Sequence, residues 1–341
     1  MRRNENKMIL NKRDSGYIKG IAIIMMIFHH FFAFPEWQLT TGLFMGGGSV
    51  LGKPLEVFLG EICKLCVCIF AFISGYGTYV SLVRVDNHGC IKYALRKIAN
   101  LLLMYWLSLL FVVSVLSIFK KISTLEIICN IILQSTSIIY TAWYVVFYIQ
   151  AIVMALICFR INKLLAECIF LLPIPVLIEY VDPGNMFSHY FPVFMLGYIF
   201  SKYRLYEKWE NLYKRNFLKY VTSTFLLLMA FILRLVVGDS IGPVSVITLI
   251  GPIITYALVY FVRICTKIKL IDKILTFCSK YSVWYWFVHV IFHSKVVWLQ
   301  NIGYLPKIPL LIIIWVFIIL TPVAILLQKV YLSISSILRM K

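Results

Sequence analysis

Apolar residues occur in long runs along this chain, and short polar loops separate the runs. A run of about 20 apolar residues is long enough to cross the hydrocarbon core of a bilayer as a helix. The pattern therefore predicts an all-α fold, a polytopic membrane bundle of about ten transmembrane helices. The predicted spans are residues 17–35, 60–82, 97–118, 141–159, 164–181, 187–201, 217–237, 243–262, 281–299 and 308–328.

Segment 125–139 decides the topology, because it is apolar but short and ends in polar residues. If it does not span, the most basic loops fall on the same side as both termini, which the positive-inside rule places in the cytoplasm. If it spans, the basic loop 202–219 moves outside, which the same rule disfavours. We therefore predict cytoplasmic N- and C-termini, with 119–140 as an outer excursion containing an interfacial or re-entrant helix.

The same pattern predicts one membrane domain over 17–330, between a basic cytoplasmic segment, 1–16, and a cytoplasmic tail, 331–341. Of the 341 residues, 62% are hydrophobic and 14% are charged, whereas about a quarter of a soluble domain is charged. The net charge of +19 follows the loops, so it indicates topology and lipid contact rather than a nucleic-acid partner. We expect a multi-pass protein of the inner or plasma membrane.

The nine cysteines lie mostly within apolar runs. Residues 63–68, "CKLCVC", look like part of a metal motif, but no second cysteine pair or nearby histidine completes a tetrahedral set. Buried thiols behave as small apolar groups. We predict free cysteines, no disulfide framework and no metal site.

The first apolar run carries Lys19 near its start and His29 and His30 further in. Ionisable side chains at membrane depth are costly and are candidates for function. Lys19 and His30 are eleven residues apart, which returns to within ~20° of the same helix face, ~16 Å along the axis. His29 points ~80° away from that stripe. The alternative is that Lys19 snorkels to the inner surface and His30 bonds within the bundle.

Several further residues offer both a structural and a functional interpretation. Ser74 and Tyr76 lie in a run of small residues, which favours either close helix packing or a ligand passage. Arg96 and Lys97 begin the third predicted span, as topology signals or as ligands for an anionic cofactor.

Aromatic and histidine residues near the predicted outer surface are also candidates. Trp143 and Tyr144 fit an aromatic belt or a platform on which a sugar stacks. His289 and His293 have i, i+4 spacing and share a face of a helix, but no third zinc ligand is evident. An internal contact of the bundle is the better interpretation of His289.

Six segments, in order, resemble the acyltransferase-3 family of integral membrane acyltransferases. They are "DSGYIKGIAIIMMIFHHFF", "IFAFISGYGTYVSL", "YALRKIANLLLMYWL", "AWYVVFYI", "FPVFMLGYIFSKY" and "SKYSVWYWFVHVIF". The first is similar to the family's basic residue and following histidine, positions that Lys19 and His30 fill. Many members have arginine in place of Lys19, and the basic pair that opens the third span is interrupted by Asn100.

The resemblance implies an acetyl-CoA-dependent O-acetyltransferase of polysaccharide biosynthesis in the cell envelope. It would move an acetyl or other acyl group from cytoplasmic acyl-CoA to a hydroxyl of a cell-surface glycan or lipid-linked sugar. His30 would be the general base. Because this chain ends soon after its last span, it would transfer directly or use a separate extracytoplasmic acyl-accepting partner. A transporter or flippase for a glycan or lipid precursor, and a non-catalytic scaffold, are the alternatives.

In that scheme acyl-CoA is the donor substrate, and no cofactor is bound permanently. Lys19, Arg96 and Lys97 would hold the phosphates of coenzyme A. The residues expected to contact the thioester oxygen or the acceptor are Ser74, Tyr76, Trp143, Tyr144 and His289.

Overall fold

The computed structural model describes residues 8–40, 42–44, 46–85, 89–213, 215–237 and 246–338. Residues 1–7 of the predicted N-terminal segment and 339–341 of the predicted tail lie outside the described residues, as does 238–242, a predicted outer loop.

Helices make up nearly all of the regular structure in the described residues, and two short strands form a hairpin. The first helices and strands are α1 (Lys12–Phe32), η2 (Pro35–Trp37), β1 (Ser49–Val50), β2 (Lys53–Pro54), α2 (Leu55–Cys63), α3 (Leu65–Leu82), α4 (Gly89–Leu116), α5 (Thr124–Ile131), η3 (Tyr140–Ala142) and α6 (Trp143–Ile161). They are followed by α7 (Leu164–Leu171), α8 (Pro173–Val181), α9 (Met186–Tyr203), α10 (Leu205–Glu210), α11 (Asn216–Val237), α12 (Val246–Cys265), α13 (Lys269–Val288), η4 (His289–His293), α14 (Val297–Gly303) and α15 (Pro309–Ile337).

Eight helical stretches in the described part of the chain are long and apolar enough to cross a membrane. This confirms the all-α, polytopic membrane class, with eight such stretches instead of about ten. They are Lys12–Phe32, Leu55–Leu82, Gly89–Leu116, Tyr140–Ile161, Leu164–Val181, Asn216–Arg234, Thr248–Cys265 and Pro309–Ile337.

The two remaining predicted spans differ from the structure in different ways. Span 187–201 is present as α9, a mostly buried helix that contains Ser188, His189 and Lys202. Span 281–299 is not a single helix, because α13 ends at Val288 and a 3₁₀ segment and α14 follow. The doubtful segment 125–139 contains only the eight-residue α5, which is too short to cross a bilayer.

The first helix begins earlier and ends earlier than the predicted 17–35. Asn11 caps its start, since the Asn11 Oδ1 atom accepts from the Asp14 amide at 2.9 Å and the Asn11 Nδ2 atom donates to Asp14 Oδ2 at 2.9 Å. The first bond is that of an N-cap side chain, and the second joins the two side chains. The helix ends before Pro35, because Phe34 lies outside the α conformation (φ −125°, ψ 73°), which is disfavoured for a residue before proline.

The chain forms two compact units. The first unit is Met1–Ala22, Leu65–Leu95 and Phe147–Lys280, and the second is Ile23–Lys64, Arg96–Val146 and Tyr281–Lys341. Four helices, α1, α4, α6 and α13, contribute residues to both units.

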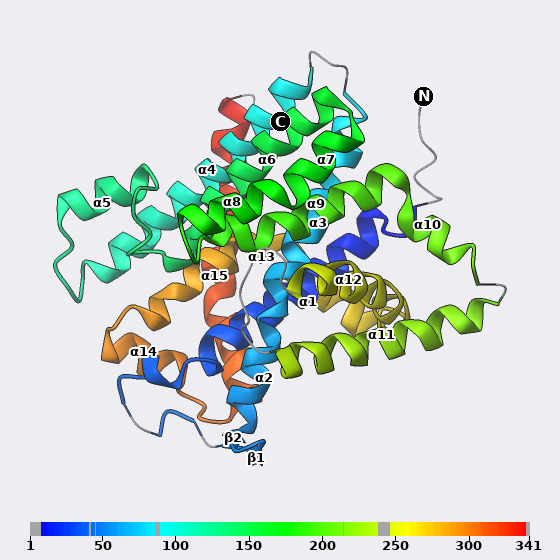
Figure 1. The fold of residues 1–341 in the computed structure, drawn as a ribbon. Helices are drawn as coiled ribbons and strands as arrows, with labels where there is room; N and C mark the ends of the chain where they lie inside the picture. Colours follow the sequence, from blue (N-terminus) through cyan, green and yellow to red (C-terminus); the bar gives the residue numbers. More distant parts are fainter. Residues whose placement is uncertain are drawn as a thin grey trace. The chain divides into compact units, whose positions relative to one another are not determined.

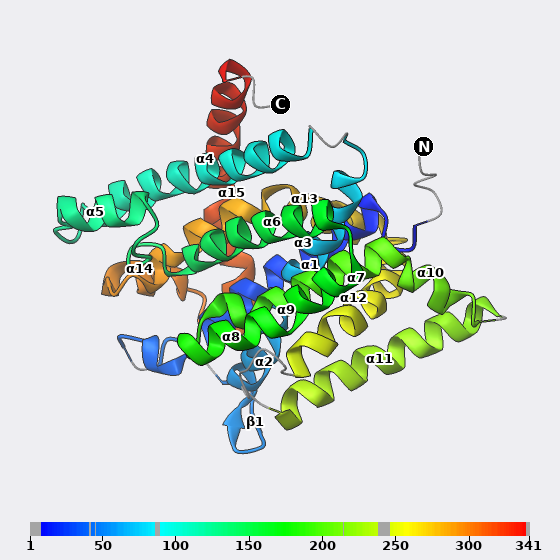
Figure 2. The same ribbon diagram turned by 45° about the horizontal axis from the view of Figure 1, so that its top comes forward.

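In the first unit, α3 packs closely along α9, and α12 packs beside both (Figure 1). A Cβ atom on Gly75 would run into the carbonyl oxygen of Phe194, and one on Gly197 would run into the carbonyl oxygen of Phe72. Two glycines therefore let the backbones of α3 and α9 approach each other from both sides, as small residues do in membrane helix pairs. Helices α11 and α12 form the neighbouring pair (Figure 2).

In the second unit, partly buried polar side chains connect α13, α14 and α15. The indole of Trp284 donates to Gln328 Oε1 at 2.7 Å, and the hydroxyls of Tyr285 and Thr321 lie 2.7 Å apart. The indole of Trp315 donates to the Ile302 carbonyl at 2.8 Å. These bonds hold the C-terminal part of α13, which leads into η4.

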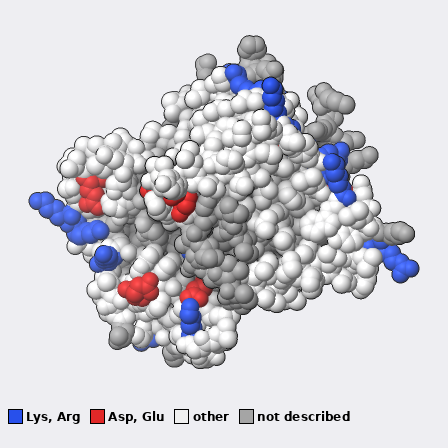
Figure 3. Space-filling model, viewed as in Figure 1, with Lys and Arg blue, Asp and Glu red and all other residues white. Residues whose placement is uncertain are grey.

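Charged side chains are sparse over much of the face shown in Figure 3. Many large apolar side chains are exposed, including Leu110, Leu165, Leu177, Leu310 and Ile318. An exposed apolar surface of this kind fits contact with lipid rather than water.

Candidate active site

Two histidines from distant parts of the sequence meet in the second unit. The Nδ1 atom of His30, near the end of α1, lies 2.7 Å from the Nε2 atom of His289 in η4. Their rings stack with centroids 4.8 Å apart and an interplanar angle of 6°. His289 is fully buried and His30 is half-buried, so His30 is the member of the pair that a substrate can reach.

A hydrogen-bond chain assigns the tautomers of this pair. The Nδ1 atom of His289 lies 3.0 Å from the carbonyl oxygen of Tyr285. A carbonyl only accepts, so we assign the proton of neutral His289 to Nδ1, which leaves a lone pair on its Nε2 atom. That lone pair accepts from Nδ1–H of His30, and the Nε2 atom of His30 then carries the free lone pair.

The 3₁₀ geometry of η4 sets the direction of His293 relative to His289. Residues four apart lie about 40° apart around an α-helix but about 120° apart around a 3₁₀ helix. The rings of the two histidines nevertheless meet edge-on, with centroids 6.1 Å apart and an interplanar angle of 69°. The ring of His293 also packs 4.7 Å from Phe31 and 6.2 Å from Trp37, between ring centroids.

Aromatic side chains form a wall beside His30. The ring of Tyr140 meets that of His30 edge-on at 5.3 Å, and its hydroxyl lies 3.4 Å from His289 Nε2. Trp37 stacks on Phe34 at 4.1 Å and meets Tyr140 edge-on at 5.4 Å. Trp37 is 38% exposed, so it offers an open aromatic surface close to the histidine pair.

The buried Gln300 of α14 fixes the loop that carries Trp37. Its Nε2 atom donates to the Trp37 carbonyl at 3.0 Å, and its Oε1 atom accepts from the Leu39 amide at 2.6 Å. The Tyr304 hydroxyl donates to the Phe31 carbonyl at 2.5 Å at the end of α1. The wall is therefore held by side-chain bonds to backbone.

His29 has a different environment from His30. It is buried, and its Nδ1 atom lies 2.8 Å from the carbonyl oxygen of Gly60 in α2. A Cβ atom on Gly60 would lie 2.7 Å from the amide nitrogen of Ala33, so α2 approaches the end of α1 very closely. His29 thus joins two helices of the second unit, whereas His30 faces the aromatic wall.

The other predicted site residues lie in both units. Lys19 lies on α1, and Ser74 and Tyr76 lie on α3, all in the first unit. Arg96 and Lys97 are exposed on the α4 portion of the second unit.

The predicted aromatic platform lies one turn further along the chain than the wall beside His30. Trp143 and Tyr144 begin α6, and the Tyr144 ring packs 4.9 Å from Trp286. Sequence reasoning missed Trp37 and Tyr140. Trp37 lies just after the first predicted span and Tyr140 just before the fourth. Across the described residues, no group of three or more His, Cys, Asp or Glu side chains has the arrangement to hold a metal ion.

The fold and the site together define a polytopic helical membrane protein with a partly buried histidine pair beside an aromatic wall. Residues 14–329 match the model of a family described as an acyltransferase domain. The match covers nearly the whole chain, so the protein belongs to this acyltransferase-3 family and is a multi-pass membrane acyltransferase. No curated protein and no solved structure shows a significant similarity to the chain.

Proposed function

We propose that the protein transfers an acyl group, acetyl in the first instance, from cytoplasmic acyl-CoA to a hydroxyl of a cell-surface glycan or lipid-linked sugar. The observation that carries this proposal is the 2.7 Å contact between His30 and His289. It leaves the lone pair of His30 Nε2 available to a substrate hydroxyl, as general-base catalysis requires.

In this reaction the Nε2 atom of His30 takes the proton of the acceptor hydroxyl. The hydroxyl oxygen attacks the thioester carbonyl, a C–O bond forms and the C–S bond breaks. The coenzyme A thiolate then takes the proton from the imidazolium of His30 and leaves as a thiol. The base is thereby restored, and protons and electrons balance.

We assign His289 a positioning role instead of the oxyanion contact that its sequence position suggested. Its Nε2 atom already accepts from His30, and its Nδ1 atom is committed to the Tyr285 carbonyl. An acceptor at His30 Nδ1 keeps the proton off Nε2 and stabilises the imidazolium as it forms. Ser74 and Tyr76 remain candidates for contacts with the thioester oxygen, and Trp143 and Tyr144 for contacts with the acceptor.

The aromatic wall supports a sugar as the acceptor. Trp37 is exposed; its ring stacks on Phe34, and its backbone carbonyl accepts from Gln300. A preformed aromatic ring offers the apolar face of a sugar a rigid surface at little entropic cost. Lys19, Arg96 and Lys97 are the proposed contacts for the phosphates of the donor.

The test compares surface glycan from cells that carry the wild-type gene, no gene, or the His30→Ala or His29→Gln variant. We expect a base-labile ester that disappears with the gene and with His30→Ala. His29→Gln is the matched control, because it removes the adjacent buried imidazole and retains the ester. Membrane abundance and a melting temperature by intrinsic fluorescence establish that each variant is folded. Identical esters in the wild-type and deletion strains would refute the proposal for that glycan.

A further inference from the structure

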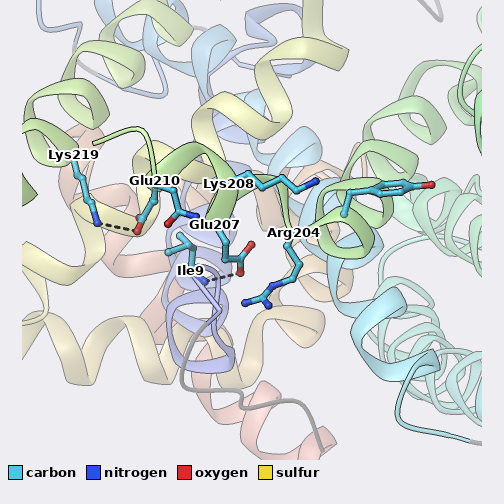
Figure 4. Close-up of a pocket in the computed structure, with 8 residues that line it drawn as sticks. Ile9, Arg204, Glu207, Lys208, Glu210 and Lys219 are labelled. Atoms are coloured by element: carbon cyan, nitrogen blue, oxygen red, sulfur yellow. Dashed lines mark hydrogen bonds and ion pairs between the residues drawn. The ribbon is translucent and has the colours of Figure 1, made fainter. Parts of the chain in front are cut away.

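The first unit contains a polar pocket of about 490 Å³ where α9, α10 and α11 meet the segment before α1. The side chains labelled in Figure 4 that line it are Ile9, Arg204, Glu207, Lys208, Glu210 and Lys219. The positive-inside pattern predicts that this end of the helices faces the cytoplasm. The pocket is separate from the residues of the histidine pair, and the inference below does not depend on the proposed reaction.

The two carboxylates of the pocket differ in how well they are satisfied. One oxygen of Glu210 pairs with Lys219 Nζ at 3.1 Å, and the other accepts from the hydroxyl of Tyr260. Glu207 accepts at Oε1 from the Ile9 amide at 3.2 Å, but its Oε2 atom is buried without a hydrogen-bond partner in the described structure. A buried, unpaired carboxylate oxygen is costly and calls for a cationic donor.

The two cations nearest to Glu207 in sequence are exposed. Arg204 and Lys208 form no ion pair within the described part of the chain. Arg204 also has a left-handed backbone (φ 54°, ψ 47°) where α9 ends and α10 begins. A non-glycine residue in this conformation carries strain, and glycine would relieve it. The presence of arginine here therefore suggests a role for its side chain.

We propose that this pocket binds the phosphoethanolamine headgroup of a zwitterionic phospholipid. The ammonium group would donate to Glu207 Oε2, and the phosphate would accept from Arg204 and Lys208. Leu212 and Phe217, in the adjacent turn and at the start of α11, are 76% and 73% exposed. These apolar side chains favour a lipid over a soluble molecule, because they offer a surface for acyl chains.

Hydrogen bonds and an ion pair fix the segment before α1 at the side of the pocket. The backbone of Ile9 donates to Glu207, and its carbonyl accepts from Arg263 Nη2 at 2.7 Å. The same guanidinium pairs with Asp14 at 2.6 Å. The chain before α1 is thus clamped where it closes one side of the pocket.

The experiment is native mass spectrometry of the full-length protein released from nanodiscs of equal phosphatidylethanolamine and phosphatidylglycerol. The wild type should retain phosphatidylethanolamine preferentially. Glu207→Gln should reduce this preference about tenfold, since one charge-assisted hydrogen bond contributes about that factor. Arg204→Gly should lower retention of both lipids while the melting temperature stays the same or rises, because glycine relieves the left-handed backbone.

Lys267→Ala is the matched control, because Lys267 is an exposed cation of the first unit outside the pocket. It should leave the lipid preference unchanged. Equal retention of the two lipids by the wild type would overturn the proposal, as would a Glu207→Gln protein that keeps the preference. Displacement of the lipid by soluble glycerophosphoethanolamine would support a headgroup site that does not need acyl chains. Displacement by coenzyme A would overturn the lipid assignment.

Discussion

Replacing His289 tests the link between the histidine pair and catalysis. His289→Leu removes the acceptor of the 2.7 Å bond and leaves Nδ1–H of His30 without its partner. His289→Gln places an amide oxygen near the former position of Nε2, so it restores an acceptor for that hydrogen. We expect activity in the order wild type, His289→Gln, His289→Leu.

The size of the effect follows from the charge that forms on His30. A hydrogen bond to a charged group is worth about 1.5–3 kcal/mol, and each 1.36 kcal/mol changes a rate about tenfold. Loss of the acceptor should therefore lower kcat by roughly 10- to 150-fold in His289→Leu. The KM for acyl-CoA should change little, because His289 is buried behind His30 and is not among the proposed donor contacts.

The assay is transfer of radiolabelled acetyl from acetyl-CoA to membrane glycan by the purified protein in proteoliposomes. His29→Gln controls for the loss of a buried imidazole, because the Nδ1 atom of His29 bonds to the Gly60 carbonyl. If His289→Leu and His289→Gln were equally active, or if both affected only the KM for the donor, the positioning role of His289 would be wrong.

Three further predictions concern packing, the acceptor and pH. Gly75→Ala should destabilise the protein by about 1–3 kcal/mol, because its added Cβ atom would meet the backbone of α9. Gly77 faces open space, so Gly77→Ala should be neutral or stabilising by about 0.5–1 kcal/mol. Thermal melts in detergent measure both effects. Trp37→Ala should raise the KM for the acceptor about 2- to 10-fold and Trp37→Phe less, and steady-state kinetics at saturating donor will distinguish them. A hydrogen bond from the Tyr17 hydroxyl lowers the pKa of Asp272. The ionised Asp272 carboxylate therefore stabilises the fold above the ordinary carboxyl pKa of about 3.9, and this stabilisation is lost as the pH falls through the lowered pKa of Asp272. Asp272→Asn should therefore lower the melting temperature near neutral pH and have no effect in strong acid, as melts of both proteins across pH would show.

The sequence predicted the membrane class because hydrocarbon thickness sets the length of an apolar run. It could not show which helix packs against α3, because Gly75 and Gly197, which bring the backbones of α3 and α9 together, lie far apart in the chain. The sequence also did not predict that α13 ends at Val288, because the apolar composition continues from α13 into the 3₁₀ segment η4.

The site could be predicted in part. His30 and His289 were both candidates, but they are 259 positions apart in the sequence. Hydrophobic periodicity cannot predict a contact between residues so far apart in the chain. Trp37 and Tyr140 lie in short 3₁₀ segments, η2 and η3, next to the ends of longer helices, where the hydrophobic pattern carries little information. The choice of His30 over His29 as the base is a prediction that the geometry supports and the proposed assays will test.

The winding of η4 also makes the spacing of its two histidines adjustable without altering either ring. A 3₁₀ helix rises about 2.0 Å per residue and an α-helix about 1.5 Å. Rewinding the five residues of η4 as an α-helix would shorten the segment by about 2.5 Å and turn His293 by about 80° toward the face of His289. Substitutions at Val290 and Ile291 that favour one winding over the other would therefore change the alignment of the two histidines, although neither residue is proposed to touch the substrate.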